Sequence, residues 1–305
     1  MKNLLKMADL SRDEITQILD LADQLKYERK HGIPHPKLAG KSIGLIFQKS
    51  STRTRVSFET GVYQLGGQAL FLSSRDLQIG RGEPVQDTAR VLSRYLNGIM
   101  IRTYAQKEVE DLAKYGSIPV INGLTDYCHP CQVLADLMTV REHYGLLEGL
   151  KMCYIGDGDN MANSLIVGGL RTGMKVSVAT PEKYRPAADV LAEAEKNPDF
   201  QITTNPKEAA ADADVVITDT WISMGMESEK EKRIRDFTGY TVDDDLMKCA
   251  KSGAMVMHCL PAYRGYEITE KVFEDHADEI FEEAENRLHA QKAVMVDLFA
   301  DPETK

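Results

Sequence analysis

Five consecutive residues, Ser51-Thr52-Arg53-Thr54-Arg55, combine three hydroxyl groups with two guanidinium groups. The apolar run 42–47 before them predicts a buried strand, and residues 56–65 after them predict a helix. Free N–H groups and the dipole of a helix N-terminus favour negative charge, and arginine can bind a phosphate through two parallel hydrogen bonds. The stretch therefore predicts a phosphate-binding turn. A capping hydroxyl beside a solvated arginine would explain only one of the three hydroxyls.

Short apolar strands alternate with helices along the whole chain, which predicts an α/β fold with two domains, each a parallel sheet flanked by helices. Strands are expected at 42–48, 68–73, 98–103 and 118–122, then at 151–156, 175–179, 200–203, 214–219 and 254–258. Helices are expected at 11–30, 53–66, 84–96, 107–115, 132–144, 160–172, 185–196, 206–211, 242–250 and 277–299. The predicted domains are 1–147, joined by the C-terminal helix 288–305, and 148–287.

Polar residues follow several of these strands directly. Ligands of open parallel sheets bind beyond the carboxyl ends of the strands. Ser51, Arg102, residues 123–129 and 157–160, Asp219 and Cys259 all lie just after predicted strands. We therefore expect them to meet in an active site in the cleft between the two domains.

The totals narrow the class of protein. The 305 residues carry a formal net charge of −10, which disfavours non-specific binding to nucleic acid. Residues 41–110 nevertheless hold ten Lys/Arg against six Asp/Glu, so positive charge gathers around the predicted phosphate site. The start lacks a signal-peptide pattern and no apolar run is long enough for a membrane helix, so we expect a cytoplasmic protein without membrane contact. Five cysteines without export signals are expected to be reduced thiols.

Each generic cofactor-binding motif in this sequence lacks a residue or a structural context that it requires. Gly40-Lys41-Ser42 resembles the end of a P-loop, but position 35 is His instead of Gly, and Gly156-Asp157-Gly158 lacks the third glycine of a dinucleotide fingerprint because position 161 is Met. A zinc site built from Cys128, Cys131, His258 and Cys259 is disfavoured, because adjacent strand residues point in opposite directions and there is no second CxxC. A redox role for Cys128 and Cys131 lacks the expected strand–helix context.

Three blocks resemble the signature blocks of the aspartate/ornithine carbamoyltransferase family: residues 47–55, His129-Pro130-Cys131-Gln132 and His258-Cys259-Leu260-Pro261. A fourth, Asp219-Thr220-Trp221-Ile222-Ser223-Met224-Gly225, resembles the substrate loop of the ornithine-specific members. The similarity extends to 76–83 and 285–290 and covers nearly the whole chain. Departures are small: Gln48 stands where an acidic residue is common, Tyr263 where His is frequent, and Asp159 where a second Asn is common.

The resemblance implies that the carbamoyl group of carbamoyl phosphate is transferred to the δ-amine of L-ornithine, giving L-citrulline and phosphate. No metal, nucleotide or flavin cofactor is implied. The implied carbamoyl phosphate ligands are Ser51, Thr52, Arg53, Thr54, Gln78, Arg102, His129, Gln132, Cys259, Leu260 and Arg287. The implied ornithine ligands are Asn160, Asp219, Ser223 and Met224. Arg102, His129 and Cys259 are the implied catalytic residues, and Cys259 is either the base for the amine or its positioner.

Taken singly, several of these residues have plainer interpretations. Arg102 fits a boundary salt bridge, His129 a loop histidine, Arg287 a partner of Glu283, and Cys259 a buried apolar thiol. Gln78 lies on a polar loop that, in the family, reaches a neighbouring subunit, which implies a homotrimer or a multiple of trimers. Residues 226–235 form a charged stretch that is expected to act as a lid over the substrates.

Alternative functions remain open at this point. Another carbamoyltransferase, acting on putrescine, acetylornithine or aspartate, is the nearest alternative, although Ser223-Met224-Gly225 offers no cation for a second carboxylate. A non-catalytic binding protein on this fold would have lost Arg53, His129 or Cys259. The resemblance places the reaction in arginine metabolism without distinguishing synthesis from degradation.

Overall fold

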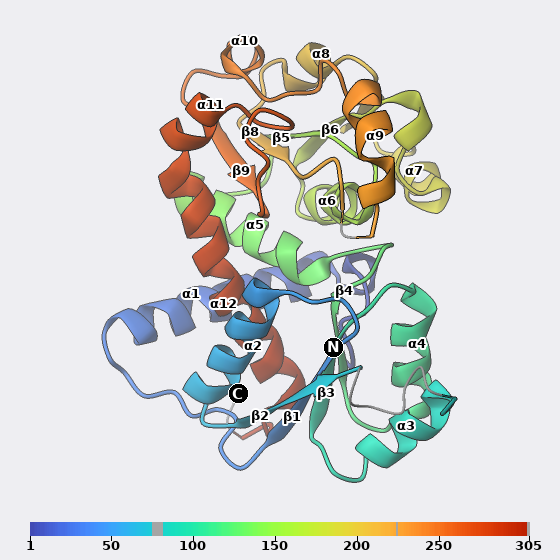
Figure 1. Cartoon of the computed structure of the whole chain (residues 1–305). Helices are drawn as coiled ribbons and strands as arrows, with labels where there is room; N and C mark the ends of the chain where they lie inside the picture. Colours follow the sequence, from blue (N-terminus) through green and yellow to red (C-terminus); the bar gives the residue numbers. More distant parts are fainter. Residues whose placement is uncertain (75–81, 224, 304–305) are drawn as a thin grey trace. The chain divides into compact units, whose positions relative to one another are not determined.

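The computed structural model describes residues 1–74, 82–223 and 225–303. The chain forms two compact units, one made of Met1–Met138 with Asn286–Lys305 and the other of Thr139–Glu285. Both divisions fall inside helices, α5 (Pro130–Tyr144) and α12 (Ala277–Phe299), which Figure 1 shows in green and red. The predicted boundaries, after residues 147 and 287, lie downstream of these divisions.

The first unit is built on a four-stranded parallel sheet with the order β2-β1-β3-β4. Its strands are β1 (Ser42–Phe47), β2 (Gln68–Ser73), β3 (Gly98–Arg102) and β4 (Val120–Leu124), and its other helices are α1 (Arg12–Lys30), α2 (Thr52–Gln64), α3 (Val85–Leu92) and α4 (Gln106–Tyr115). The chain leaves β1 toward β2 on one side and returns to β3 on the other. The switch point, where ligands bind in such sheets, therefore lies between the carboxyl ends of β1 and β3.

The second unit holds a five-stranded parallel sheet with the order β7-β6-β5-β8-β9. The strands are β5 (Lys151–Ile155), β6 (Lys175–Ala179), β7 (Phe200–Thr203), β8 (Val215–Thr218) and β9 (Met255–His258). Its helices are α6 (Asn160–Arg171), α7 (Ala188–Ala194), α8 (Pro206–Ala210), α9 (Lys230–Asp236), α10 (Asp244–Met247) and α11 (Glu270–Asp275). The order reverses between β5 and β8, which places a second switch point at their carboxyl ends.

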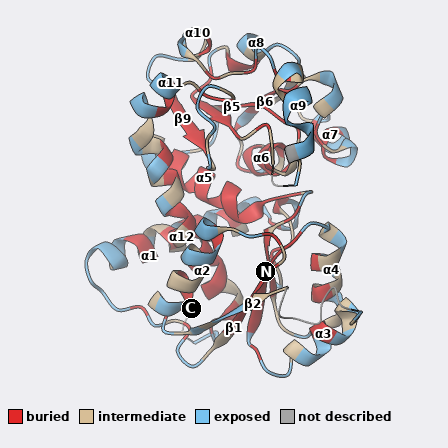
Figure 2. Ribbon diagram, viewed as in Figure 1, coloured by how far each residue is buried: buried red, intermediate tan, exposed pale blue. Residues whose placement is uncertain are grey.

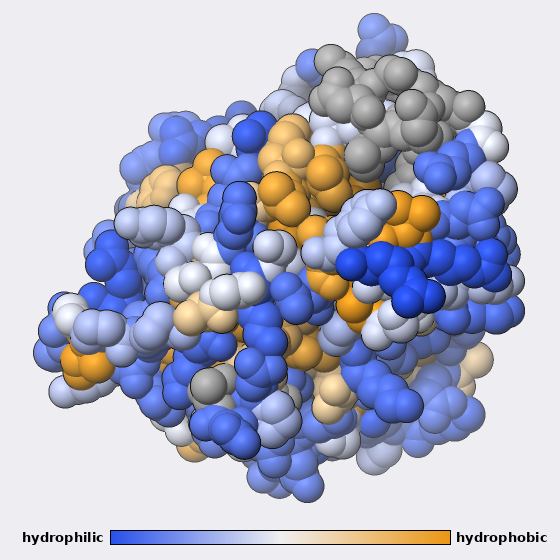
Figure 3. Space-filling model, turned by 90° about the horizontal axis from the view of Figure 1, so that it is seen from below, coloured by the Kyte–Doolittle hydropathy of each residue, from blue (hydrophilic) through white to orange (hydrophobic). Residues whose placement is uncertain are grey.

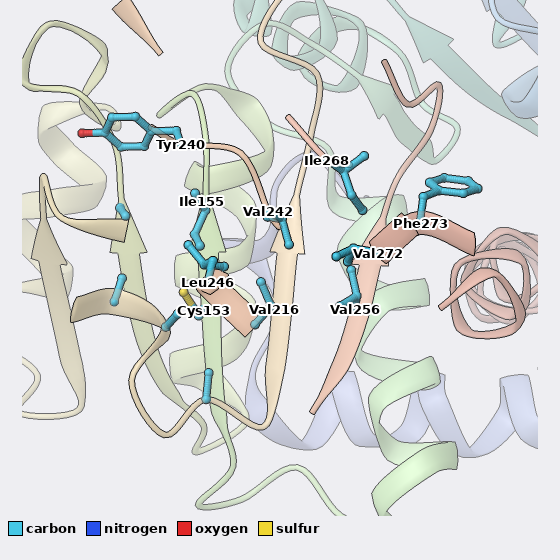
Figure 4. Packing of buried hydrophobic residues seen from close by; sticks show 14 of the residues in the cluster. Cys153, Ile155, Val216, Tyr240, Val242, Leu246, Val256, Ile268, Val272 and Phe273 are labelled. Carbon is cyan, nitrogen blue, oxygen red and sulfur yellow. The ribbon is translucent and has the colours of Figure 1, made fainter. Parts of the chain in front are cut away.

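Apolar side chains explain why these sheets form. Buried residues of β5, β8 and β9, including Cys153, Val216 and Val256, pack with Leu246 and Val272 from the covering elements (Figure 4). Removing one such side chain from water contributes about 1.5–3 kcal/mol. Figure 2 shows α5 and the central strands as mainly buried, whereas the edge strand β2 is intermediate to exposed and α9 and α7 are largely exposed. The α/β fold with two flanked parallel sheets is confirmed.

Every predicted strand is present, and its ends differ from the predicted ones by at most two residues. Two α-helices were not predicted, α9 and α11, and the helix expected at 242–250 is only Asp244–Met247. The sequence of α9, Lys-Glu-Lys-Arg-Ile-Arg-Asp, lacks an apolar stripe. Its buried residue is instead Arg233, a polar anchor that hydrophobic periodicity does not detect. Within the described ranges, no helix combines the length and the apolar character needed to span a membrane.

Candidate functional site

At the switch point of the first unit, the N-terminus of α2 carries the predicted phosphate-binding turn. Ser51 is the N-cap and accepts a hydrogen bond from the Thr54 N–H at 3.2 Å. Thr54 is fully buried, whereas Thr52 and Arg53 are exposed in the first turn of the helix. Arg55, the second arginine of the motif, instead pairs with Glu59 at 2.9 Å and lies over the ring of Phe71. Of the two arginines in the turn, Arg55 therefore has its guanidinium group engaged on the helix surface.

Two buried arginines from distant parts of the chain converge on Thr54. Arg102, the last residue of β3, donates from Nη1 to Thr54 Oγ1 at 3.4 Å, and Arg287 of α12 donates from Nη2 to the same oxygen at 3.0 Å. Arg287 Nη1 also donates to Gln132 Oε1 at 3.0 Å. Glu283, the partner that the plainer interpretation gives to Arg287, accepts a hydrogen bond from the backbone N–H of His258 at 2.8 Å.

His129 and Gln132 lie at the start of α5 beside these arginines. His129 is 3% exposed, and burial together with Arg287 and Arg102 holds the pKa of its imidazole well below the usual value. Gln132 donates to Asp136 at 2.8 Å, which orients its amide so that the oxygen faces Arg287. The structure thus brings together Ser51, Thr54, Arg102, His129, Gln132 and Arg287, a set with excess positive charge and a neutral histidine. Gln78 lies outside the described residues.

In the second unit, Asp219 follows β8, and His258 and Cys259 lie at the end of β9. One ligand atom of each lies within 4.8 Å of those of the other two. His258 Nδ1 accepts the Leu260 N–H at 2.9 Å, so the ring proton is on Nε2, which donates to Glu267 Oε1 at 3.0 Å. Because both ring nitrogens are engaged, His258 has no lone pair directed at a metal ion.

Asp219 is 7% exposed, and burial raises the pKa of its carboxyl group, while His258 and a hydrogen bond with Cys259 act in the opposite direction. Its Oδ1 accepts the N–H of Thr220 at 2.7 Å. The Cys259 thiol therefore sits against a carboxylate that can accept its proton or that of an amine. Leu260 adopts a left-handed backbone conformation with φ 59°, which the bond from its N–H to His258 maintains.

The remaining predicted residues of this unit surround the turn between β5 and α6. Asn160 is the first residue of α6, and Asp159 caps that helix by accepting the Met161 N–H at 3.1 Å. Ser223 Oγ lies 3.4 Å from Asp159 Oδ2. A side chain at Gly158 would collide with the backbone of Tyr184, Arg185 and Pro186, so this tight turn requires glycine. Met224 lies outside the described residues.

Two residues of this half were missed by sequence reasoning. Glu267 orients His258, and Arg233 of α9 forms an ion pair with Asp157 in which both side chains are buried. Arg233 also donates to the carbonyl oxygen of Trp221 at 2.9 Å, so α9, from the predicted lid, is tied to the turn after β5 and the loop after β8. Separations of 9 to 76 residues leave no local pattern that could have revealed these pairs.

Cys128 and Cys131 belong to the interior of the first unit. The Cys128 thiol donates to the carbonyl oxygen of Leu5 at 3.4 Å, and Cys131 to that of Asn122 at 3.4 Å. Burial raises the pKa of each thiol to about 12, so both are neutral at physiological pH. Neutral buried thiols are poor metal ligands and poor nucleophiles.

Comparison with known proteins matches both units. Residues 2–142 match the aspartate/ornithine carbamoyltransferase carbamoyl-P binding domain, and residues 148–298 match the Asp/Orn binding domain of the same family. The ornithine carbamoyltransferase of Caldicellulosiruptor saccharolyticus is 56% identical over 301 residues, which cover 97% of this chain and 98% of the relative. That of Oceanobacillus iheyensis is 53% identical over 305 residues, covering 98% of this chain and 95% of the relative.

Solved structures give the same result. The ornithine carbamoyltransferase from Pyrococcus furiosus superposes with a TM-score of 0.93 at 50% identity, covering 98% of this chain and 97% of that one. The anabolic ornithine carbamoyltransferase from Campylobacter jejuni superposes with a TM-score of 0.92 at 42% identity, covering 98% and 99%.

Proposed function

Because this chain belongs to the aspartate/ornithine carbamoyltransferase family, we propose that the residues assembled in its two units carry out carbamoyl transfer to ornithine. The chain transfers the carbamoyl group of carbamoyl phosphate to the δ-amine of L-ornithine and releases L-citrulline and phosphate. A place in arginine metabolism follows from these products as a proposal.

The first half-site is the set of proposed carbamoyl phosphate ligands in the first unit. Its assignment rests on one observation, the convergence of Arg102 and Arg287 on Thr54. Thr54 Oγ1 accepts from both guanidinium groups, so its own proton is free to be donated to an anion. Ser51, Thr52, Arg53 and Thr54 hold the phosphate at the N-terminus of α2. Charge held on the phosphate makes it a better leaving group, since the electron pair of the broken C–O bond goes to a phosphate oxygen.

The carbonyl oxygen of the carbamoyl group gains negative charge as the amine adds. Arg102, His129 and Thr54 are the donors that stabilise this charge, and the buried His129 acts as a neutral N–H donor. The carbonyl oxygen of Gln132, oriented by Asp136 and Arg287, is the proposed acceptor for the carbamoyl NH2 group. Gln78 and the backbone carbonyl of Leu260 complete the proposed carbamoyl phosphate ligands.

The second half-site binds the amino acid. Asp219, Asn160, Ser223 and Met224 hold the α-ammonium and α-carboxylate groups of ornithine. The δ-amine, with a pKa of about 10 in water, must lose a proton before it attacks. The Cys259–Asp219 pair is the proposed acceptor or positioner of this amine, because the carboxyl group of Asp219 has a raised pKa and contacts the thiol. The reaction requires both half-sites, since the amine must reach the carbamoyl carbon.

A homotrimer is the proposed assembly. Edge strand β2 and the neighbouring helix α2 expose large apolar side chains, namely Val56 (55%), Tyr63 (80%), Leu70 (37%) and Phe71 (38%). Figure 3 shows one face of the molecule, on which hydrophobic residues gather in patches among hydrophilic ones. Exposed apolar patches on an unpaired sheet edge favour association between chains. All five cysteines are free thiols, which favours a reducing compartment such as the cytoplasm.

The proposed function is tested by supplying purified protein with carbamoyl phosphate and, in parallel reactions, L-ornithine, putrescine, N-acetylornithine or L-aspartate. We expect turnover with L-ornithine and at least 100-fold lower kcat/KM with the other three, an order of discrimination that a missing or blocked polar contact can supply. Preferred turnover of any of the other three would replace ornithine as the substrate.

Arg53→Ala separates the roles of the two half-sites. Loss of a charge-assisted phosphate contact should raise the KM for carbamoyl phosphate by roughly 10–100-fold. The KM for ornithine should change little. Isothermal calorimetry with carbamoyl phosphate provides the direct measurement, and Arg55→Ala, whose arginine is paired with Glu59, is the matched control. Unchanged affinity in Arg53→Ala would remove this residue from the phosphate site.

A further inference from the structure

Three carboxylates lie around the switch point of the second unit. Asp157 and Asp159 lie in the turn between β5 and α6, and Asp219 follows β8. The charges of Asp157 and Asp219 both act on Asp159. Such a concentration of negative charge is costly without cations, because like charges in a partly buried site repel each other.

The three carboxyl groups differ in which nearby cations and hydrogen-bond donors offset their negative charge. Asp157 forms the buried ion pair with Arg233. Asp219 accepts a backbone N–H, and His258 and the Cys259 thiol favour its charged form. Asp159 accepts from the Met161 N–H at 3.1 Å and is paired with the Ser223 hydroxyl at 3.4 Å. Neither of these two donors is a cation, so the negative charge of Asp159 is the least compensated of the three.

The position of Asp159 also determines which ligand group it can take. An ionised carboxylate has about four lone-pair sites, and these two bonds use two of them. The N-terminus of α6, which would otherwise attract an anion, is already satisfied by the Asp159 side chain. Its two immediate neighbours in the half-site, Asn160 and Ser223, are both proposed ligands of the amino acid. A cationic part of the substrate is therefore the group that fits here.

We propose that Asp159 is a specificity-determining residue that binds the α-ammonium group of the amino-acid substrate together with Asp219. This inference rests on the proposed function and adds a residue to its amino-acid site. Amino acids with a free α-ammonium group are favoured, and N-acylated amino acids are rejected because Asp159 would face a neutral amide.

Binding of the ammonium group depends on whether the Asp159 carboxyl group is protonated. Burial and the charges of Asp157 and Asp219 raise the pKa of the Asp159 carboxyl group well above its usual value. The other titratable groups that act on this region include Tyr154 on β5, Arg233 and Glu229 through Asp157, and His258, Glu267 and Cys259 through Asp219. Burial raises the pKa of Tyr154, so this side chain is neutral. An ammonium ligand favours ionised Asp159, so its affinity falls as pH falls.

Asp159→Asn tests this assignment, because asparagine caps a helix as well as aspartate does. The probe is L-norvaline, which keeps the α-ammonium and α-carboxylate groups of ornithine but lacks the δ-amine. We expect its competitive inhibition constant against ornithine to rise about tenfold, the loss typical of a charge-assisted hydrogen bond. Between pH 8 and pH 6, affinity for norvaline should fall more steeply in the parent protein than in the variant. The KM for carbamoyl phosphate should not change.

Asp243→Asn is the matched control, because Asp243 caps α10 by accepting the Leu246 N–H at 2.8 Å and the substitution removes the same charge. If Asp159→Asn fails to fold, Asp159→Ser, which also keeps a capping oxygen, is measured instead. An unchanged norvaline constant overturns the inference. Weakened ornithine with unchanged norvaline also overturns it, since Asp159 would then face the δ-amine. Absence of citrulline formation by the parent protein would instead overturn the proposed function, and the inference with it.

Discussion

The role of each single residue here depends on which of its donor and acceptor atoms already form hydrogen bonds. Thr54 accepts from Arg102 and Arg287, which leaves its proton for a ligand. His258 accepts at Nδ1 and donates at Nε2, so it orients the Cys259–Leu260 segment instead of acting as a base. His129 is buried beside two guanidinium groups and therefore remains neutral.

The neutral state of His129 predicts a pH effect on stability. The usual pKa of 6.5 applies to the unfolded chain, whereas the folded chain has a lowered pKa. As pH falls below 6.5, the unfolded state gains a proton that the folded state resists, so His129 contributes a loss of stability of at most about 2 kcal/mol at pH 5. His129→Gln should remove this part of the acid sensitivity in urea unfolding at pH 7.5 and pH 5. His31→Gln, at an exposed histidine, is the control, and an equal effect of both substitutions would contradict the prediction.

Helix α9 shows how an element without an apolar stripe is held in place. Arg233 reaches from it to Asp157, to the Trp221 carbonyl oxygen and to Glu229, and its guanidinium lies over the Tyr184 ring. These contacts join the turn after β5 to the loop after β8, the two segments that carry Asp159, Asn160 and Ser223. The geometry of the amino-acid half-site therefore depends on this helix.

Arg233→Gln should expose that dependence. Breaking a buried ion pair leaves Asp157 uncompensated and should cost about 3–5 kcal/mol of unfolding free energy. The KM for ornithine should rise while the KM for carbamoyl phosphate stays constant. Urea unfolding and steady-state kinetics are the measurements. Arg235→Gln, on the exposed side of the same helix, should leave both quantities unchanged, and identical behaviour of the two variants would disprove the role of Arg233.

The part of α12 in the first unit is anchored by polar side chains along its length. Lys26 donates to Asn286 at 2.7 Å, and the fully buried Lys292 lies 2.7 Å from His35 Nε2 and 3.1 Å from Gln64 Oε1. Burial and the neighbouring Arg29 lower the pKa of Lys292 to about 8. The helix therefore carries a buried cation whose charge is costly at neutral pH.

Lys292→Met should remove that cost. Between pH 8 and pH 10.5 the unfolded chain binds a proton at this lysine that the folded chain has lost, so Lys292 makes the parent protein more stable as pH rises. We therefore compare the free energy of unfolding of Lys292→Met with that of the parent at each pH. The variant's advantage over the parent should be larger by about 2 kcal/mol at pH 7.5 than at pH 10. Paired urea titrations at the two pH values measure the difference. Exposed Lys30→Met should show no such change, and a constant difference for Lys292→Met would refute the argument.

For the molecule as a whole, residues 2–142 match the carbamoyl-P binding domain of the family and residues 148–298 match its Asp/Orn binding domain. Both divisions between the two units fall within the helices α5 and α12. Each sheet has its own switch point, with the proposed phosphate-binding turn at one and the carboxylates at the other. The formal net charge of −10 therefore does not reveal that one of these sites is rich in positive charge and the other in negative charge. Val56 and Tyr63, seven residues apart on α2, add an apolar face beside edge strand β2.

The proposed trimer predicts that a double variant, Val56→Lys with Tyr63→Lys, loses assembly. Both side chains are exposed, so the fold of the single chain should remain and only the contact between chains should be repelled. Light scattering after size-exclusion chromatography should show a fall to the mass of one chain, about a third of the parent value for a trimer. Phe281→Lys, at an exposed aromatic side chain of the second unit, is the control. An unchanged mass of the double variant would rule out this face.

Local sequence patterns determined the elements of this protein and several of its site residues. Apolar runs located every strand, and the strand ends placed Arg102, Asp219 and Cys259 at the carboxyl edges of their sheets. The hydroxyl-rich turn after β1 indicated an anion site because a helix N-terminus acts over a few consecutive residues. These features depend on neighbours within one or two turns of chain, so the order of residues was sufficient to predict them.

Only the tertiary structure shows which side chains become hydrogen-bond or ion-pair partners. Arg287 meets Thr54 across 233 residues of sequence, Arg233 meets Asp157 across 76, and Glu267 orients His258. It also paired Arg55, from the predicted phosphate-binding turn, with Glu59. Hydrogen bonds and ion pairs act over a few ångströms in space, and only the folded sheets bring such distant side chains within that range.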